Sequence, residues 1–176
     1  MSSGKVIVTQ LSADEAHAQS AALADILIDC VEGGASVSFM EPLARDKAET
    51  FWRRAADGVA SGARAVFAAA DEQGRIVGTV QLILDLPENQ PHRADIAKML
   101  VHRDARKKGA GDLLMQAAED AAQAMGRTLL VLDTASDDAA RLYERRNWVK
   151  AGTVPGYALL PNGGLCDTHY YYKWLR

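Results

Sequence analysis

Hydrophobic and polar positions follow two different periods along this chain, and each change of period marks the boundary of a predicted element. Two-residue alternation predicts a strand at residues 5–11. Apolar positions three and four apart then predict a helix that begins at Ser12, where Glu15 can complete a capping box, and ends at the glycine pair 33–34. A second helix is predicted to open at Pro42, because proline suits the first turn of a helix.

The rest of the chain alternates short apolar runs with two further helical patterns. The predicted strands are 63–70, 76–84, 96–101, 128–132, 148–153 and 169–175, and the predicted helices are 109–125 and 137–145. Hairpins among the early strands and strand–helix–strand units among the later ones imply an α/β fold, with a mixed sheet of about seven strands flanked by four helices. We expect a single domain over residues 1–176, since no repeat or linker divides the chain.

The stretch between the first two predicted helices has no helical period. Residues 33–40 read GGASVSFM, which is apolar and flexible. Two interpretations stay open. The stretch is either a connector that packs Val37, Phe39 and Met40 into the core, or a loop on the substrate side of the molecule.

Composition excludes several classes of protein. The 176 residues are 48% hydrophobic and 24% charged, which is typical of a globular chain with an adequate core. The net charge of −3 gives no support for nucleic-acid binding. Cys30 and Cys166 form neither a disulfide framework nor a metal-ligand set, so no metal is expected. No apolar run has membrane-spanning length and no signal peptide is evident, so we expect no membrane partner and, by default, a cytoplasmic location.

Candidate chemistry is concentrated just after the strand at 96–101. A basic, glycine-bearing turn follows that strand and consists of Arg106, Lys107, Lys108, Gly109, Ala110 and Gly111. Glycines let the backbone approach a ligand closely, and the unpaired N–H groups at the start of the next helix favour negative charge. The turn therefore predicts a phosphate or pyrophosphate site, with a solvated surface turn as the plain alternative. It matches neither the P-loop nor the G-x-G-x-x-G pattern.

The same turn reads R-x-x-G-x-G from Arg106 to Gly111, and through this motif the chain resembles the GNAT superfamily of N-acetyltransferases. The predicted order of strands and helices is similar to the GNAT acyl-CoA N-acyltransferase fold along nearly the whole chain. The resemblance implies that acetyl-CoA is the cofactor and that its pyrophosphate binds at the turn. The backbone N–H groups of residues 108–111 are the implied donors, assisted by the charges of Arg106 and Lys107.

A second motif of the family, N-x-x-A-x-x-L-Y-x-x-x-G-F, is matched in part after the fifth predicted strand. Ala139 and the pair Leu142-Tyr143 agree with it. Ser136 replaces the asparagine, and the resemblance places Ser136 beside the cofactor. Asn147 replaces the glycine, a mild change because asparagine can adopt the left-handed backbone that a helix end needs.

Shorter matches are similar to the tabtoxin-resistance type of acetyltransferase. They are GGASV-x-FM at 33–40, RAD followed by K-x-x-V within 93–101, LDT at 132–134 and PGY at 155–157. This likeness favours residues 33–40 as the lining of an acceptor pocket. It leaves the acceptor itself open.

The resemblance also implies where the rest of the cofactor lies. In the GNAT fold the pantetheine arm runs along the fourth strand, so Met99, Leu100 and Val101 are expected to pair with it, and the fifth strand must separate from the fourth. A backbone N–H near Leu100 would then face the thioester oxygen. Tyr143 resembles the family's general acid, since a phenol with a pKa of about 10 can protonate a leaving thiolate. A packed aromatic is the alternative.

Asp95 and Asp133 are the candidate general bases. Each lies at one end of an apolar strand, where a carboxylate is costly unless it is paired or faces a cleft. The resemblance implies that both reach the acceptor pocket, where two carboxylates would favour a cationic amine and relay its proton through water. The alternative is that they are turn or cap residues. Tyr157 and His169 are minor candidates on the acceptor side.

We therefore expect an acetyltransferase that moves the acetyl group of acetyl-CoA to an amine, or a hydroxyl, of a small molecule by direct attack in a ternary complex. A toxin or antibiotic is one candidate acceptor. A non-catalytic acyl-CoA-binding sensor and a protein N-acetyltransferase are the alternatives. Both a monomer and a homodimer are compatible with the sequence.

Overall fold

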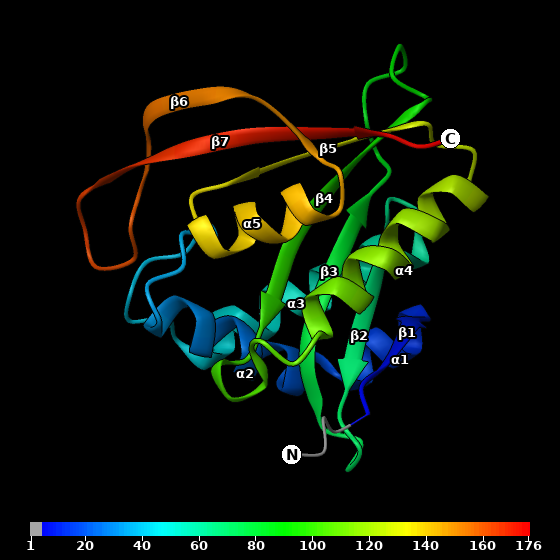
Figure 1. Ribbon diagram of the computed structural model, residues 1–176. Coiled ribbons are helices and arrows are strands. Elements are labelled where there is room, and N and C mark those ends of the chain that lie inside the picture. Colours follow the sequence, from blue (N-terminus) through cyan, green and yellow to red (C-terminus); the bar gives the residue numbers. More distant parts are fainter. Residues whose placement is uncertain (1–4) are drawn as a thin grey trace.

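A mixed seven-stranded sheet lies between two layers of helices in the computed structural model, which describes residues 5–176 (Figure 1). The strands are β1 (Ile7–Leu11), β2 (Arg64–Ala70), β3 (Ile76–Ile83), β4 (Arg93–Val101), β5 (Leu129–Thr134), β6 (Val149–Leu159) and β7 (Leu165–Trp174), in the spatial order β1-β2-β3-β4-β5-β7-β6. The helices are α1 (Ala13–Ala18), α2 (Ser20–Glu32), α3 (Arg45–Ala60), α4 (Ala110–Ala124) and α5 (Asp137–Arg145), with a short 3-10 helix, η1, at Arg103–Ala105. The predicted α/β fold is confirmed.

The first predicted helix is divided in two. Ser12 and Glu15 form the predicted capping box at the start of α1, but α1 ends at Ala18, with Gln19 as its C-cap, and α2 begins at Ser20. The hydroxyl of Ser20 donates to the carbonyl oxygen of His17 at 2.8 Å, so it satisfies a carbonyl group that the end of α1 leaves free. The described residues therefore contain five α-helices rather than the four predicted.

Two other boundaries differ from the prediction. Pro42 does not open α3, which begins at Arg45: Leu43 is buried in the core beneath the helix, and Ala44 is the N-cap with extended backbone. β6 continues through residues 155–156 to Leu159, beyond residue 153, where the predicted strand ends. An irregularity in the pairing of β6 with β7 between residues 154 and 158 accommodates that segment.

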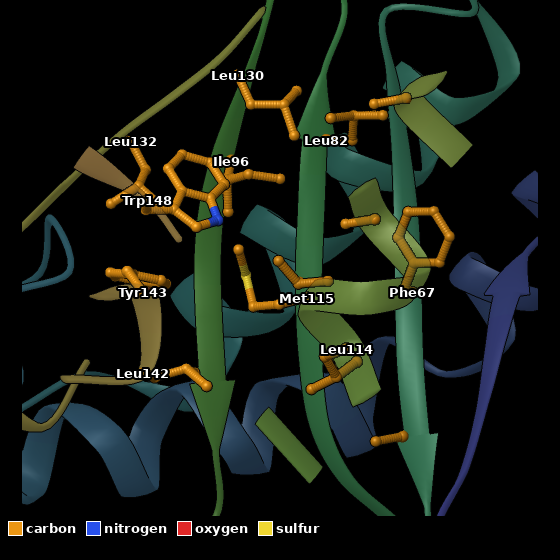
Figure 2. Packing of buried hydrophobic residues seen from close by; sticks show 14 of the residues in the cluster. Phe67, Leu82, Ile96, Leu114, Met115, Leu130, Leu132, Leu142, Tyr143 and Trp148 are labelled. Carbon is orange, nitrogen blue, oxygen red and sulfur yellow. The ribbon is translucent and has the colours of Figure 1, made fainter. Parts of the chain in front are cut away.

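Each face of the sheet has its own hydrophobic core. One core lies under α4 and α5, where Leu114 and Met115 contact the sheet beside Tyr143 and Trp148 (Figure 2). The other lies under α1, α2 and α3 and includes the fully buried Trp52. Each fully buried large apolar side chain contributes about 1.5–3 kcal/mol, so these cores hold the helices firmly against the strands.

The feature that positions the site is an opening between β4 and β5. These parallel strands pair only where Arg93–Asp95 meets Leu129–Val131. Beyond Asp95, β4 continues beside β3 and β5 continues beside β7, so the two strands separate (Figure 1). A bulge in β4 at Lys98, which has a φ of 49°, lies within the separated part. The predicted separation of the fourth and fifth strands is confirmed.

Candidate active site

The basic turn joins β4 to α4 at the wide end of this opening. Lys107 and Gly109 have φ values of 60° and 87°, so the chain adopts left-handed backbone twice before Ala110 begins α4. A Cβ at Gly109 would meet no atom within 4 Å, so glycine is needed there for its backbone angle and not for space. No side chain among residues 5–176 caps the start of α4. Its first N–H groups are therefore available to an anion.

The three cations of the turn differ in their contacts. The Nε of Arg106 donates to the carbonyl oxygen of Val101 at 3.0 Å, so this side chain folds back onto the end of β4. The Nζ of Lys108 donates to the carbonyl oxygen of Asp104 at 2.7 Å. Lys107 is exposed, and the described part of the chain offers it no hydrogen bond. Arg106 and Lys108 thus shape the turn, and Lys107 keeps its ammonium free for an anion.

Gly111 brings α4 close to its neighbours. A Cβ at this position would lie 3.2 Å from Cδ2 of Leu142 and 3.3 Å from Cε of Met99, which is tighter than an ordinary contact. The first turn of α4 can therefore approach both β4 and α5 only because residue 111 has no side chain.

Tyr143 is packed on α5 behind the opening. Its side chain is buried, with ring centroids 5.9 Å from Trp148 and 6.1 Å from Tyr171. Its hydroxyl forms no hydrogen bond with any described residue, whereas the hydroxyl of Tyr171 donates to Glu144 at 2.9 Å. Burial and, second, the charge of Asp133 raise the pKa of Tyr143 well above its ordinary value, so the phenol keeps its proton at neutral pH.

The carboxylate of Asp133 is close enough to act on Asp95 through its charge. Asp95 is beside Val131 in the β4–β5 pair, and Asp133 is two residues further along β5. Burial and the charge of Asp133 raise the pKa of Asp95, while its ion pair with Arg93 opposes that rise. Asp133 accepts a hydrogen bond from Oγ1 of the buried Thr168 at 2.8 Å.

A cavity of about 280 Å³ lies at the end of β5. It is lined by Ser36, Ser38, Phe39, Met40, Asp133, Thr134, Ala135, Tyr157, Ala158, Leu159, Cys166, Asp167 and Thr168. The segment 36–40 and the β6–β7 hairpin therefore form two of its walls. Val37 and Phe39 also contact the core under α3, as the connector interpretation predicts, whereas Met40 is exposed and not part of that core. The substrate-side interpretation stays a prediction.

The remaining predicted positions separate into those near the cavity and those away from it. Tyr157 lines the cavity, and its hydroxyl accepts a hydrogen bond from Tyr170 at 3.1 Å. Nδ1 of His169 is 2.8 Å from Oγ1 of Thr153, and His169 does not line the cavity. The Tyr157 hydrogen bond, burial and the charge of Asp133 raise the pKa of Tyr170 to about 12.

Ser136 and Asn147 occupy the two ends of α5. The Oγ of Ser136 accepts the N–H of Ala139 at 3.2 Å, so Ser136 is the N-cap of the helix. Asn147 has a φ of 64°, the left-handed conformation predicted for it. Sequence reasoning did not single out Lys98, Thr168 or Tyr170 as site residues. The alternation of side chains along β7 is the signal that could have indicated the last two.

Metal and membrane sites are not evident in residues 5–176. No group of three or more His, Cys, Asp or Glu side chains in this range is placed to hold a metal ion. Among the described helices, none combines the length and the apolar character needed to span a membrane.

Comparison with known proteins gives a consistent result. Residues 22–148 match the family described as Acetyltransferase (GNAT) family. The fold is similar to that of a GNAT superfamily phosphinothricin acetyltransferase from Sinorhizobium meliloti in complex with acetyl-CoA, with a TM-score of 0.81, 16% identity, and coverage of 97% of this chain and 88% of that chain. An N-acetyltransferase from Staphylococcus aureus Mu50 has a TM-score of 0.80 and 18% identity, with coverage of 98% of this chain and 99% of that chain. A ribosomal-protein-alanine N-acetyltransferase from Brucella melitensis has a TM-score of 0.79 and 21% identity, with coverage of 96% of this chain and 99% of that chain. The TM-scores show a shared fold, and at identities of 16–21% the likeness extends to the fold alone.

Proposed function

The chain belongs to the GNAT acetyltransferase family, whose cofactor is acetyl-CoA, and from this premise we propose that it acetylates an amine of a small molecule. The observation that carries the proposal is the opening between β4 and β5. The uncapped start of α4 lies at its wide end; Asp95 ends the paired part of the two strands, and Asp133 lies two residues beyond that part on β5. A small amine-bearing toxin or antibiotic is a candidate acceptor, because the adjoining cavity measures about 280 Å³.

The residues of the opening fit acetyl-CoA. The first N–H groups of α4 and the ammonium of Lys107 suit a pyrophosphate. Met99, Leu100 and Val101 have no β5 partner, so their main-chain groups on that edge can pair with an extended pantetheine arm. The hydroxyl of Ser136 accepts the Ala139 N–H and can still donate its own proton to the cofactor.

Each reacting proton has a candidate side chain. Bound acetyl-CoA supplies an acyl carbon activated as a thioester. Asp133 takes the proton of the attacking amine, directly or through water, and Thr168 holds its carboxylate in place. The Tyr143 hydroxyl, which is protonated and has no partner among the described residues, donates to the leaving thiolate. Asp95 adds negative charge that favours a cationic amine before its deprotonation.

The direct test is thiol release from acetyl-CoA with a panel of small amines and amine-bearing toxins, for the wild type and Tyr143→Phe. We expect kcat of the variant to fall by about 10²–10⁴-fold while the Kd for acetyl-CoA stays unchanged, since only proton transfer is removed. Tight acetyl-CoA binding without turnover on any acceptor would instead support the acyl-CoA sensor. Turnover confined to peptide N-termini or lysines would support a protein N-acetyltransferase.

A further inference from the structure

A lysine borders the acceptor cavity across from Asp133. Lys98 lies at the bulge of β4 and is half-buried. Its Nζ donates to Oγ of Ser38 at 3.3 Å and lies 5.6 Å from the ring centre of Phe51. Ser38 and Asp133 both line the cavity, so the ammonium of Lys98 is one hydroxyl group away from the space in which the acceptor is proposed to bind.

This ammonium has no carboxylate partner among residues 5–176. Its contacts there are the hydroxyl of Ser38 and the face of Phe51, neither of which carries a charge. Burial is the main effect and lowers the pKa of Lys98; the charge of Asp133 opposes it, and the smaller effect of the cation Arg64 adds to it. Two positive charges therefore share this region, and the carboxylate of Asp133 acts on Lys98 through space, without a hydrogen bond or ion pair to it in the described chain.

The surrounding groups are also donors. Gln81 pairs with Ala97 across β3 and β4, so it lies next to Lys98 in the sheet. The Oε1 of Gln81 is the single acceptor atom of that side chain, and it accepts a hydrogen bond from Arg64 at 2.8 Å. The Nε2 of the fully buried Gln81 and the Nε of Arg64 have no hydrogen-bond partner among the described residues. Both atoms are enclosed by the protein and neither residue lines the cavity, so this group acts on a ligand there only through the charge of Arg64.

We propose that Lys98, with the charge of Arg64 behind it, binds an acidic group of the acceptor. The acceptor is then a zwitterion of the amino-acid class, with its amine at Asp133 and its carboxylate, or a comparable anion, at Lys98. A cavity bordered by one cation and lined by a carboxylate is complementary to such a molecule. This inference rests on the proposed function, because it assigns an acceptor class to the same site.

The experiment compares matched acceptors. Free L-amino acids are each assayed beside the corresponding amide and the decarboxylated amine, by thiol release for turnover and by calorimetry for binding in the presence of CoA. The variants are Lys98→Met, which removes the charge, and Lys98→Arg, which keeps it. Lys47→Met is the control, because Lys47 lies 5.9 Å from the Phe39 ring near the same loop but is exposed.

We expect the wild type to prefer at least one acid over its amide by about tenfold or more in kcat/KM or Kd, the value of one charge-assisted hydrogen bond. Lys98→Met should abolish that preference mainly through the affinity for the acid, whereas Lys98→Arg and Lys47→Met should keep it. Equal use of acids and amides by an active wild type would overturn the inference and leave the proposed function intact. Selective binding of acids without acetyl transfer would support the inference and refute the proposed function.

Discussion

Replacement of Gly109 by alanine tests whether the left-handed turn before α4 holds the cofactor. The φ of 87° costs a residue with a Cβ about 1–2 kcal/mol, while the absence of atoms within 4 Å removes any steric term. For a chain of 176 residues we expect the melting temperature to fall by about 2–8 °C. If the strained turn relaxes, the N–H groups at residues 110 and 111 change direction, and the Kd for acetyl-CoA should rise about tenfold or more.

The matched control is Gly74→Ala. Gly74 has a φ of 76°, and a Cβ added there would also meet no atom within 4 Å, but this glycine lies in the hairpin between β2 and β3. Both variants should therefore lose similar stability in thermal melts, and only Gly109→Ala should lose affinity in calorimetric titrations with acetyl-CoA. An unchanged Kd for Gly109→Ala, or an equal loss in both variants, would refute the assignment of this turn to the pyrophosphate.

Two further predictions concern groups that support the site. Thr168→Val should lower kcat/KM about tenfold and the free energy of unfolding by about 1.5–3 kcal/mol, because it removes the hydrogen bond to the Asp133 carboxylate. Thr153→Val, which removes the His169 partner, should leave kcat/KM unchanged. Equal rates for both threonine variants would exclude a positioning role. Glu119→Gln should lower the free energy of unfolding by about 3 kcal/mol in urea titrations, because the buried Glu119 binds Arg146, Lys173 and the indole of Trp148. Burial raises the pKa of Glu119, but these partners outweigh it and lower the pKa, so the stabilisation is complete above the ordinary value of 4.5 and is lost as pH falls through the folded-state value. A variant as stable as the wild type at pH 7 would contradict this.

Features set by local pattern could be predicted from the sequence. The order and type of the strands and helices follow from side-chain periods of two and 3.6, which neighbouring residues alone establish. The capping box at Ser12 and the left-handed backbone at Asn147 also depend on a few adjacent residues, and both are present. The turn from Arg106 to Gly111 belongs to this group, because its glycines and the helix start that follows lie next to one another in the chain.

Tertiary structure decided what depends on partners far apart in the sequence. Burial of Leu43 displaced the start of α3 away from Pro42, and pairing with β7 extended β6 past its proline and glycine. The bulge at Lys98 and the separation of β4 from β5 arise from competing strand registers, which no local pattern records. That separation gives Asp133 its place at the cavity and leaves one edge of β4 unpaired. The sequence therefore determined the elements and the turn, and three-dimensional pairing made the opening between them.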